Sequence, residues 1–571
     1  MSDDPKEAAE NPKRSFWQRL FGRAPAPAAD GVAPPAARAP KLQTITAEEA
    51  ARHRKSTPAA GVRRGRRAKE AAPIVGIDFG TSYSSVSVVR DGQIEIVRFE
   101  DGEAMIPSVV SFPGPDVVLV GAEARERMGG YAQWTIASPK RLLGRPYADP
   151  DSERQIAGLA FRSFAGSDQF LRIEAHGGVY SVIDVCAMLL EKLRERASVH
   201  LGADVSEAVF SAPVSFGSLQ RSALEAAARR AGLRVVNILS EPTAAVVAHG
   251  FGSEFFGKVA VFDFGGGTFD FCVLEVNHRA YQVLCSGGDP WLGGDDFDAA
   301  IANYAADAFW KQVNVDLRQR AVEWQALLFA CERAKRVLTR RRSAKVSAPD
   351  LIHTADGMKG VQFKLSRKDF NALTESLVQR SIDTTERVMH QAKIPPRDVD
   401  AVVLTGGTAL IPAVRDAVAK LFGKRPQTAD AHLAVVKGNA IRAAEVSGEP
   451  LPDFAEARQV KDVAGRSFGA SMDNGPLLSL FERDTPVPAE CDHTFVTSQD
   501  GQQEMALCLF EQSTSRVDQS RPIGRLFLRG IRPARAGAEQ VTVTFILDED
   551  GLFTVSAEVA GQQYTQTIRT R

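Results

Sequence analysis

The pattern of apolar and polar positions divides the chain into an unpatterned start and two patterned regions. From Ile74 to about Glu445, short apolar runs of strand length alternate with longer runs of helical periodicity, which is typical of an α/β architecture. From about residue 467, strand-length runs are separated by turn signals such as Asp500-Gly501, and they predict an all-β sandwich. Between the two regions, residues 447–461 are polar, contain two prolines and predict a linker. The predicted divisions are therefore residues 1–73, 74–446, 447–461 and 462–571.

The first division, residues 1–73, predicts a disordered basic arm. It carries 9 prolines and 18 alanines and has no periodicity that could form a core. It holds 15 Lys and Arg against 8 Asp and Glu, whereas the rest of the chain holds 55 against 62. One segment, KRSFWQRLFGR, places its apolar side chains on one helical face. That face could contact an anionic surface or a partner's groove, or it is only a short apolar cluster in the arm.

The composition excludes several classes of protein. With 70 basic and 70 acidic residues among 571, the chain is not a uniformly basic nucleic-acid coat, and we expect no specific nucleic-acid partner. No run of about 18 apolar residues predicts a membrane-spanning helix, and the first 30 residues lack the apolar core of a secretory signal. The six cysteines are scattered without metal-binding spacing, which predicts reduced thiols and a cytoplasmic protein.

Two glycine-rich turns of the α/β region share one pattern and lie 185 residues apart. The first, Asp78 to Ser82, follows an apolar strand over Ile74–Ile77, and the second, Asp263 to Thr268, follows a strand over Val259–Phe262. Glycines let backbone amides approach an anion closely, and the Thr and Ser hydroxyls add donors. The carboxylate at each strand end suits a hydrated Mg²⁺ ion. The repetition favours a duplicated phosphate-binding site over two ordinary hairpin turns.

A third element lies near the end of the same region. An apolar strand over Ala401–Leu404 runs into Gly406-Gly407, and a helix is expected to begin near Pro412, because proline suits the first position of a helix. A glycine turn before a helix N-terminus is a common seat for an anion or a nucleotide.

In this order, the three elements resemble the actin-like ATPase domain of the 70-kDa heat-shock (DnaK-type) chaperones. The segments around EPTAA (residues 241–245), WLGGDDFD (291–298) and CERAKRVL (331–338) are also similar. They separate the chain from actins and sugar kinases, which share only the fold. The resemblance implies a duplicated α/β ATPase with ATP or ADP in a central cleft, together with Mg²⁺ and K⁺.

The resemblance also implies roles for single residues. Lys140, in SPKRLLGR, would orient the attacking water, while Asp78 and Asp263 would hold Mg²⁺ through water. Glu241, Asp270 and Thr268 would order the metal, K⁺ and the γ-phosphate. The other residues implied to contact nucleotide are Gly80, Thr81, Ser82, Tyr83, Gly265, Gly266, Gly267, Gly294, Glu332, Lys335, Arg336, Thr339, Gly406, Gly407, Thr408 and Leu410. Pro213 and Arg221 match positions that relay the nucleotide state to the rest of the molecule.

Two positions depart from the family pattern. Leu410 stands where the family has an arginine that stacks on adenine, so a cation–π contact is lost and nucleotide affinity should fall. Residues Ala104–Ser108 read AMIPS and lack a threonine hydroxyl that the family places near the phosphates. Because the rest of the hydrolytic set is complete, the sequence predicts a slow but working ATPase.

Residues 462–571 resemble the peptide-binding β-sandwich of the same family. The residues that match its peptide site are Ala470, Met472, Asp473, Phe495, Met505 and Leu507. Asp473 stands at an arch position that is usually apolar, and an enclosed unpaired charge there would be costly. The usual leucine-rich linker reads RQVKD here, with only Val460 apolar, so coupling between the nucleotide and peptide sites is in doubt. No residues remain for a helical lid, which predicts fast release of bound peptide.

Two functions of different class follow. The first is an ATP-hydrolysing chaperone for protein folding and stress response, which binds unfolded polypeptide with J-domain and nucleotide-exchange co-chaperones. The second is a nucleotide-gated scaffold that holds one dedicated protein client with little or no hydrolysis, which Leu410, Asp473 and the polar linker favour. A filament-forming actin relative is a weaker reading because of the β-module.

Overall fold

The computed structural model describes residues 73–568 apart from residues 129–130, 150–151, 154–155, 157–158, 177, 250–255, 356, 429, 453–456, 473–475 and 513–519. Residues 1–72 of the predicted arm, with its apolar segment, lie outside the described residues. Asp473 of the predicted peptide site also lies outside them, so the role of the arm and that of Asp473 both stay predictions.

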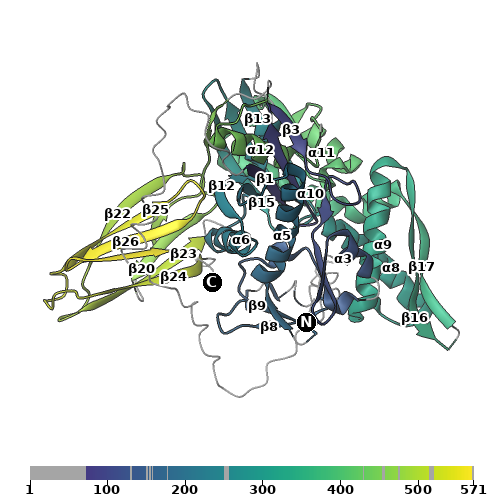
Figure 1. Cartoon of the computed structure of the whole chain (residues 1–571), viewed down its shortest axis with the longest axis horizontal. Helices are drawn as coiled ribbons and strands as arrows, with labels where there is room; N and C mark the ends of the chain where they lie inside the picture. The colour runs from purple at the N-terminus through teal and green to yellow at the C-terminus, as the bar shows by residue number, and fades with distance from the viewer. Residues whose placement is uncertain are drawn as a thin grey trace, which may run out of the picture. The chain divides into compact units, whose positions relative to one another are not determined.

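The first half of the α/β region is a lobe built on a sheet of order β12-β11-β1-β2-β3, with β4 beside β2. Figure 1 labels β12, β1 and β3 of this sheet. Its strands are β1 (Ile74–Phe79), β2 (Tyr83–Arg90), β3 (Gln93–Ile96), β4 (Ile106–Pro107), β11 (Glu207–Ala212) and β12 (Arg234–Ser240). β1 and β2 form an antiparallel hairpin, and β11 runs parallel to β1. Val75, Ile77 and Phe79 are fully buried, as expected for a central strand.

The second half repeats this arrangement around a sheet of order β18-β13-β14-β15-β19. Its strands are β13 (Gly257–Phe264), β14 (Phe269–Val276), β15 (Ala280–Asp289), β18 (Ala401–Thr405) and β19 (Gln459–Lys461). β13 and β14 form the antiparallel hairpin and β18 runs parallel to β13. The hairpin with a parallel neighbour confirms the predicted duplication.

Two helices, α7 (Glu241–Ala248) and α12 (Ala434–Ser447), pack on one another and share a buried cluster with strands of both sheets. The contact requires glycine: a Cβ on Gly438 would lie 1.9 Å from the Ala244 carbonyl oxygen, and one on Gly76 2.2 Å from the Ala440 nitrogen. Asn439 then donates one hydrogen bond to the Ile77 carbonyl at 2.9 Å. The two sheets, each of which carries one glycine turn, therefore pack on the same pair of helices.

The remaining elements of the two lobes lie around these sheets. The helices are α3 (Ala122–Arg127), α5 (Val182–Leu201), α6 (Ser218–Arg230), α8 (Gly294–Val313), α9 (Ala321–Arg340), α10 (Arg367–Gln391) and α11 (Pro412–Phe422). Three smaller sheets consist of β5 (Val109–Gly114) with β6 (Val117–Val120) and β7 (Thr135–Ala137), of β8 (Arg162–Ala165) with β9 (Leu171–Ala175) and β10 (Gly178–Ser181), and of β16 (Ser343–Thr354) with β17 (Gly357–Ser366). Helix α11 begins at Pro412, as predicted.

The C-terminal region is a sandwich of two four-stranded antiparallel sheets, which confirms the predicted all-β module. One sheet has the order β21-β20-β23-β24, formed by Leu478–Phe481, Ser467–Met472, Glu504–Gln512 and Ser520–Arg529. The other has the order β22-β25-β26-β27, formed by Ala489–Val496, Gln540–Leu547, Phe553–Val559 and Gln562–Thr567. Alternate side chains of both sheets meet in one buried cluster.

The segment predicted as a linker ends in a strand. β19 pairs in parallel with β15, so that Val460 lies opposite Tyr281. Arg458 is only 2% exposed and its guanidinium lies 5.4 Å from the centre of the Tyr281 ring. The linker is therefore held by backbone pairing and by one arginine, although its sequence lacks the usual leucines.

Polar contacts join the sandwich to the first lobe. The Asp550 side chain accepts a hydrogen bond from the backbone nitrogen of Ile238 at 2.7 Å, and Arg221 donates to the Asp550 carbonyl at 2.9 Å. The Glu511 carboxylate accepts from the backbone nitrogen of Ser218 at 3.1 Å, at the start of α6. Arg221, expected to relay the nucleotide state, therefore contacts the sandwich directly.

Candidate functional site: a cleft between two glycine turns

The two glycine turns face one another where the two lobes meet, and we call this boundary the cleft. A Cβ on Gly266 would lie 1.9 Å from the Ser82 hydroxyl oxygen, and one on Gly267 would lie 2.5 Å from the Thr81 methyl carbon. Side chains at these positions would displace the side chains of Ser82 and Thr81 in the opposite turn. The predicted phosphate-binding residues of the two halves are therefore neighbours, and glycine is required by the approach itself.

Buried charges gather behind the turns. The Lys140 ammonium lies 2.7 Å from a carboxylate oxygen of Glu241, and the lysine is 2% exposed. Burial, reinforced by the Glu241 charge, raises the pKa of both Asp78 and Asp270 to about 7. Burial and the surrounding carboxylates also raise the pKa of Asp263. Four acids around one lysine leave an excess of negative charge, which a cation would neutralise.

The donor set fits a hydrated divalent cation. One oxygen of Asp270 has no hydrogen-bond partner although it is buried. Within the described part of the chain, no three acidic, imidazole or thiolate side chains converge to ligate one ion directly. Carboxylates that are buried, uncompensated and spread over two strand ends suit Mg²⁺ that keeps most of its water shell.

Helix α9 supplies the face that was predicted to hold adenosine. The Lys335 ammonium donates to the Gly294 carbonyl and to Asp298, both at 2.7 Å. Arg336 donates to the Tyr83 hydroxyl at 2.7 Å. The predicted residues of α9 and of the first turn therefore lie together, across the boundary between the lobes.

The remaining two predicted residues of α9 differ in their contacts. Glu332 forms an ion pair with Arg125 of α3, and this pair also joins the two lobes. The Thr339 hydroxyl donates to the Arg336 carbonyl at 2.7 Å within its own helix. Arg125 was missed by the sequence analysis, because it lies outside every motif and 207 residues from its partner.

The turn at Gly406-Gly407 closes the same cleft. Gly406 has a φ of 82°, which favours glycine, and the Thr408 hydroxyl donates to the Gly265 carbonyl at 2.7 Å. A Cβ on Gly407 would lie 3.3 Å from the His432 ring. Burial, with Arg336 nearby, lowers the pKa of His432, so its imidazole is neutral near pH 7. His432 was missed, because no motif marks it.

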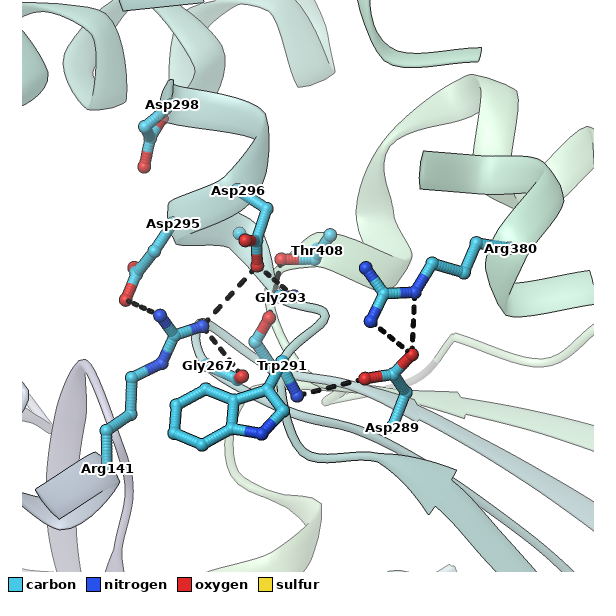
Figure 2. A network of polar contacts seen from close by, with 12 residues as sticks. Arg141, Gly267, Asp289, Trp291, Gly293, Asp295, Asp296, Asp298, Arg380 and Thr408 are labelled. Atoms are coloured by element: carbon cyan, nitrogen blue, oxygen red, sulfur yellow. Dashed lines mark hydrogen bonds and ion pairs between the residues drawn. The ribbon is translucent and has the colours of Figure 1, made fainter. Parts of the chain in front are cut away.

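A further polar network was missed as well. Arg141 directly follows Lys140, and its guanidinium reaches across the cleft to the carbonyl of Gly267 and to Asp295 and Asp296 (Figure 2). Its position beside Lys140 and the acidic GDDFD run were both visible in the sequence. Only the fold reveals that they meet.

One short segment connects the cleft to the sandwich. The backbone nitrogen of Ser215, two residues after Pro213, donates to Asp270 at 3.3 Å. The Ser215 carbonyl accepts two hydrogen bonds from Arg466 of the sandwich, the shorter at 2.6 Å. The predicted relay position Pro213 therefore lies in a loop that contacts both regions.

The residues predicted to bind peptide lie within the sandwich. Ala470, Phe495, Met505 and Leu507 are all buried in its core, and Met472 is half-buried beside them. They come from both sheets and meet between them. In this arrangement their side chains pack on one another.

The described helices include none that is both long and apolar enough to cross a membrane. The six cysteines form no disulfide: four are buried, and Cys491 and Cys508 are half-buried. A comparison with protein families matches residues 74–571 to the family described as Hsp70 protein. The match covers both lobes, the linker and the sandwich, and therefore most of the chain.

Proposed function

The chain belongs to the Hsp70 protein family, whose members are ATP-binding chaperones, and from this premise we propose that it binds ATP and hydrolyses it slowly to ADP and phosphate. The observation that carries the proposal is the buried Lys140–Glu241 pair among Asp78, Asp263 and Asp270, directly behind two facing glycine turns. A lysine enclosed by four acids contributes little to folding by itself. It suits a reaction in which phosphate charge must be positioned.

Different groups of the chain would bind the phosphates, the metal ion and the attacking water. The backbone amides of the turns, with the hydroxyls of Thr81, Ser82 and Thr268, would hold the phosphates. The Lys140 ammonium, held at 2.7 Å from Glu241, would donate a hydrogen bond to the attacking water and to a γ-phosphate oxygen. Mg²⁺, carried in with ATP, supplies neutralisation of the phosphate charge, and Asp78 and Asp263 would hold it through water. Asp270 and Thr268 are the proposed contacts of K⁺.

Hydrolysis then depends on placement rather than on covalent chemistry. Water attacks the γ-phosphorus in line with the bond to the β-bridging oxygen, that bond breaks, and ADP carries the electron pair away. The proton of the water passes to the solvent or to a nearby carboxylate. The buried site excludes competing water and fixes the geometry, which is the main contribution of the fold.

We further propose that the sandwich binds unfolded polypeptide and that the cycle uses J-domain and nucleotide-exchange partners, as is typical of the family. We also propose a cytoplasmic location, because the six cysteines are scattered along the chain without disulfide or metal-binding spacing. A scaffold with one dedicated client remains the second candidate. The burial of Ala470, Phe495, Met505 and Leu507 favours it, because a peptide reaches these side chains only if the sheets separate.

The first test is phosphate release by the purified chain with Mg²⁺-ATP. Wild type should turn over measurably, and Lys140→Ala and Thr268→Ala should reduce the rate at least tenfold. Arg318→Ala is a matched control, because Arg318 pairs with Asp307 and Asp316 away from the cleft. Wild-type turnover equal to that of the Lys140 and Thr268 variants would refute the ATPase. ATP binding without turnover would support the second candidate function, the nucleotide-gated scaffold.

A further inference from the structure

A single arginine of the first lobe holds the phosphate turn of the second lobe. Arg141 lies in the short 3₁₀ turn η2 (Pro139–Leu142), and its side chain is 9% exposed. Its Nη2 atom donates to the Gly267 carbonyl at 2.7 Å (Figure 2). Nη1 lies 3.6 Å from a carboxylate oxygen of Asp295, and Nη2 lies 3.5 Å from one of Asp296. All three partners belong to the other lobe.

The partners of Arg141 form one unit. The backbone nitrogen of Asp295 donates to the Gly266 carbonyl at 2.8 Å, which ties the start of α8 to the phosphate turn. The Asp296 carboxylate accepts from the backbone nitrogen of Gly293 at 2.8 Å and so caps α8. A guanidinium that contacts the turn and both aspartates therefore fixes the turn and the helix start together.

A second contact of the same segment reinforces the first. Arg145 donates from its Nε to the Arg141 carbonyl at 3.0 Å, and its guanidinium lies 4.4 Å from the centre of the Trp291 ring. Trp291 lies in the loop before α8, near Asp295 and Asp296 (Figure 2). The segment that carries Lys140 is thus joined to the second lobe at two points.

The position of Arg141 in the chain links these contacts to the reaction. On one side, its neighbour Lys140 is fixed by Glu241 at 2.7 Å. On the other side, its own side chain fixes Gly267, which the sequence places in the phosphate turn. A displacement of Lys140 relative to the phosphate turn at Gly267 would move the lysine away from the γ-phosphate. A misplacement of about 1 Å is enough to cost on the order of 100-fold in rate.

We propose that Arg141 is a positioning residue for ATP hydrolysis. It holds the Gly265–Gly267 turn of the second lobe in register with Lys140 of the first, and it acts through these groups without contacting the reacting atoms. The inference rests on the proposed ATPase function. Asp295 and Asp296 are its counter-charges, and the guanidinium fork is needed because carbonyl and carboxylates must be bound together.

The test compares Arg141→Ala and Arg141→Lys with wild type in single-turnover hydrolysis and in equilibrium binding of ADP. We expect Arg141→Ala to lower the hydrolysis rate 10- to 100-fold while the dissociation constant for ADP changes less than threefold. Arg141→Lys keeps the charge but loses the fork, and should restore part of the rate. Adding Asp295→Asn to Arg141→Ala should produce no further loss, because the two residues act through one contact.

The matched control is Arg380→Ala. Arg380 pairs with Asp289 in the same loop region at 2.6 Å, but both residues lie in the second lobe (Figure 2), so hydrolysis should stay within twofold of wild type. Hydrolysis by both Arg141 variants at the wild-type rate would overturn the inference and leave the ATPase intact. A wild-type protein that neither binds nor hydrolyses ATP would instead overturn the proposed function. If Arg141→Ala does not fold, Arg141→Lys decides the question alone.

Discussion

Binding of Mg²⁺-ATP should release protons from the buried carboxylates of the cleft. Without a cation, burial and the Glu241 charge hold the pKa of Asp78 and of Asp270 at about 7, so each is half protonated at pH 7. A divalent cation favours the ionised form and displaces these protons. The two residues together should release about one proton per nucleotide at pH 7. The release should rise toward about two at pH 6 and fall toward zero above pH 8.5.

Calorimetric titration in buffers of different ionisation enthalpy measures this number directly. Since protons compete with the cation, the dissociation constant should fall as pH rises from 6 to 8, by about tenfold per pH unit for each proton released. Asp78→Asn removes one of the titrating groups and should reduce both the release and the pH dependence. Binding enthalpies that do not depend on the buffer at pH 7 would refute the reasoning.

The same groups set the pH dependence of stability in the nucleotide-free protein. The folded pKa of about 7 lies above the unfolded value of 3.8, so the native state binds more protons than the unfolded state between these limits. Stability from Asp78 is therefore fully present below about pH 4 and is lost as pH rises through 7, by at most about 1.4 kcal/mol per pH unit. The free energy of unfolding of wild type minus that of Asp78→Asn, both measured by thermal unfolding from pH 5 to 8, gives this slope.

Three other changes test the cleft and the sandwich contact. Gly266→Ala should abolish measurable ATP binding, because the new methyl group would meet the Ser82 hydroxyl at 1.9 Å; unchanged affinity in equilibrium dialysis would contradict the facing turns. His432→Ala should weaken ADP binding about 3- to 10-fold if the imidazole beside Gly407 contacts the nucleoside, and isothermal titration measures it. Asp550→Ala removes the acceptor for the Ile238 nitrogen and should weaken the contact between the sandwich and the first lobe by about 1–3 kcal/mol. Faster proteolytic cleavage within residues 447–461 would report this weakening.

The glycine turns could be predicted from the sequence because their signal is local. An apolar strand, an aspartate, and glycine with a hydroxyl residue stand side by side in the chain, and the repetition of this pattern indicated two homologous halves. The hydrolytic lysine needed the family resemblance, since Lys140 and Glu241 are 101 residues apart and nothing local pairs them. Arg141 and Arg125 were missed for the same reason: each acquires its partner only when the lobes meet. His432 was missed because no motif marks it, and only the fold of the second lobe places its ring beside Gly407.

The linker shows another limit of the sequence. Its sequence, RQVKD, lacks the leucines that would bury apolar area, and this put coupling between the nucleotide and peptide sites in doubt. The structure fixes it by a parallel strand pairing with β15, which depends on backbone groups that every residue except proline carries. Arg458 adds its guanidinium, which lies over the Tyr281 ring, so the charged group itself supplies a contact with an aromatic side chain.

Only a few bonds separate the nucleotide cleft from the sandwich. Asp270 accepts from the Ser215 nitrogen, Ser215 accepts from Arg466, and Arg466 lies 3.6 Å from the buried Glu511. Ser215 uses its backbone nitrogen in the bond to Asp270 and its backbone carbonyl in the bonds to Arg466. A shift of Ser215 that lengthens the first bond therefore also moves the carbonyl that Arg466 contacts. Because the pKa of Asp270 is about 7, the charge of the Asp270 carboxylate depends on whether a cation is present. Hydrogen bonds through Ser215 thus connect the cleft to the sandwich by a route that does not use the linker.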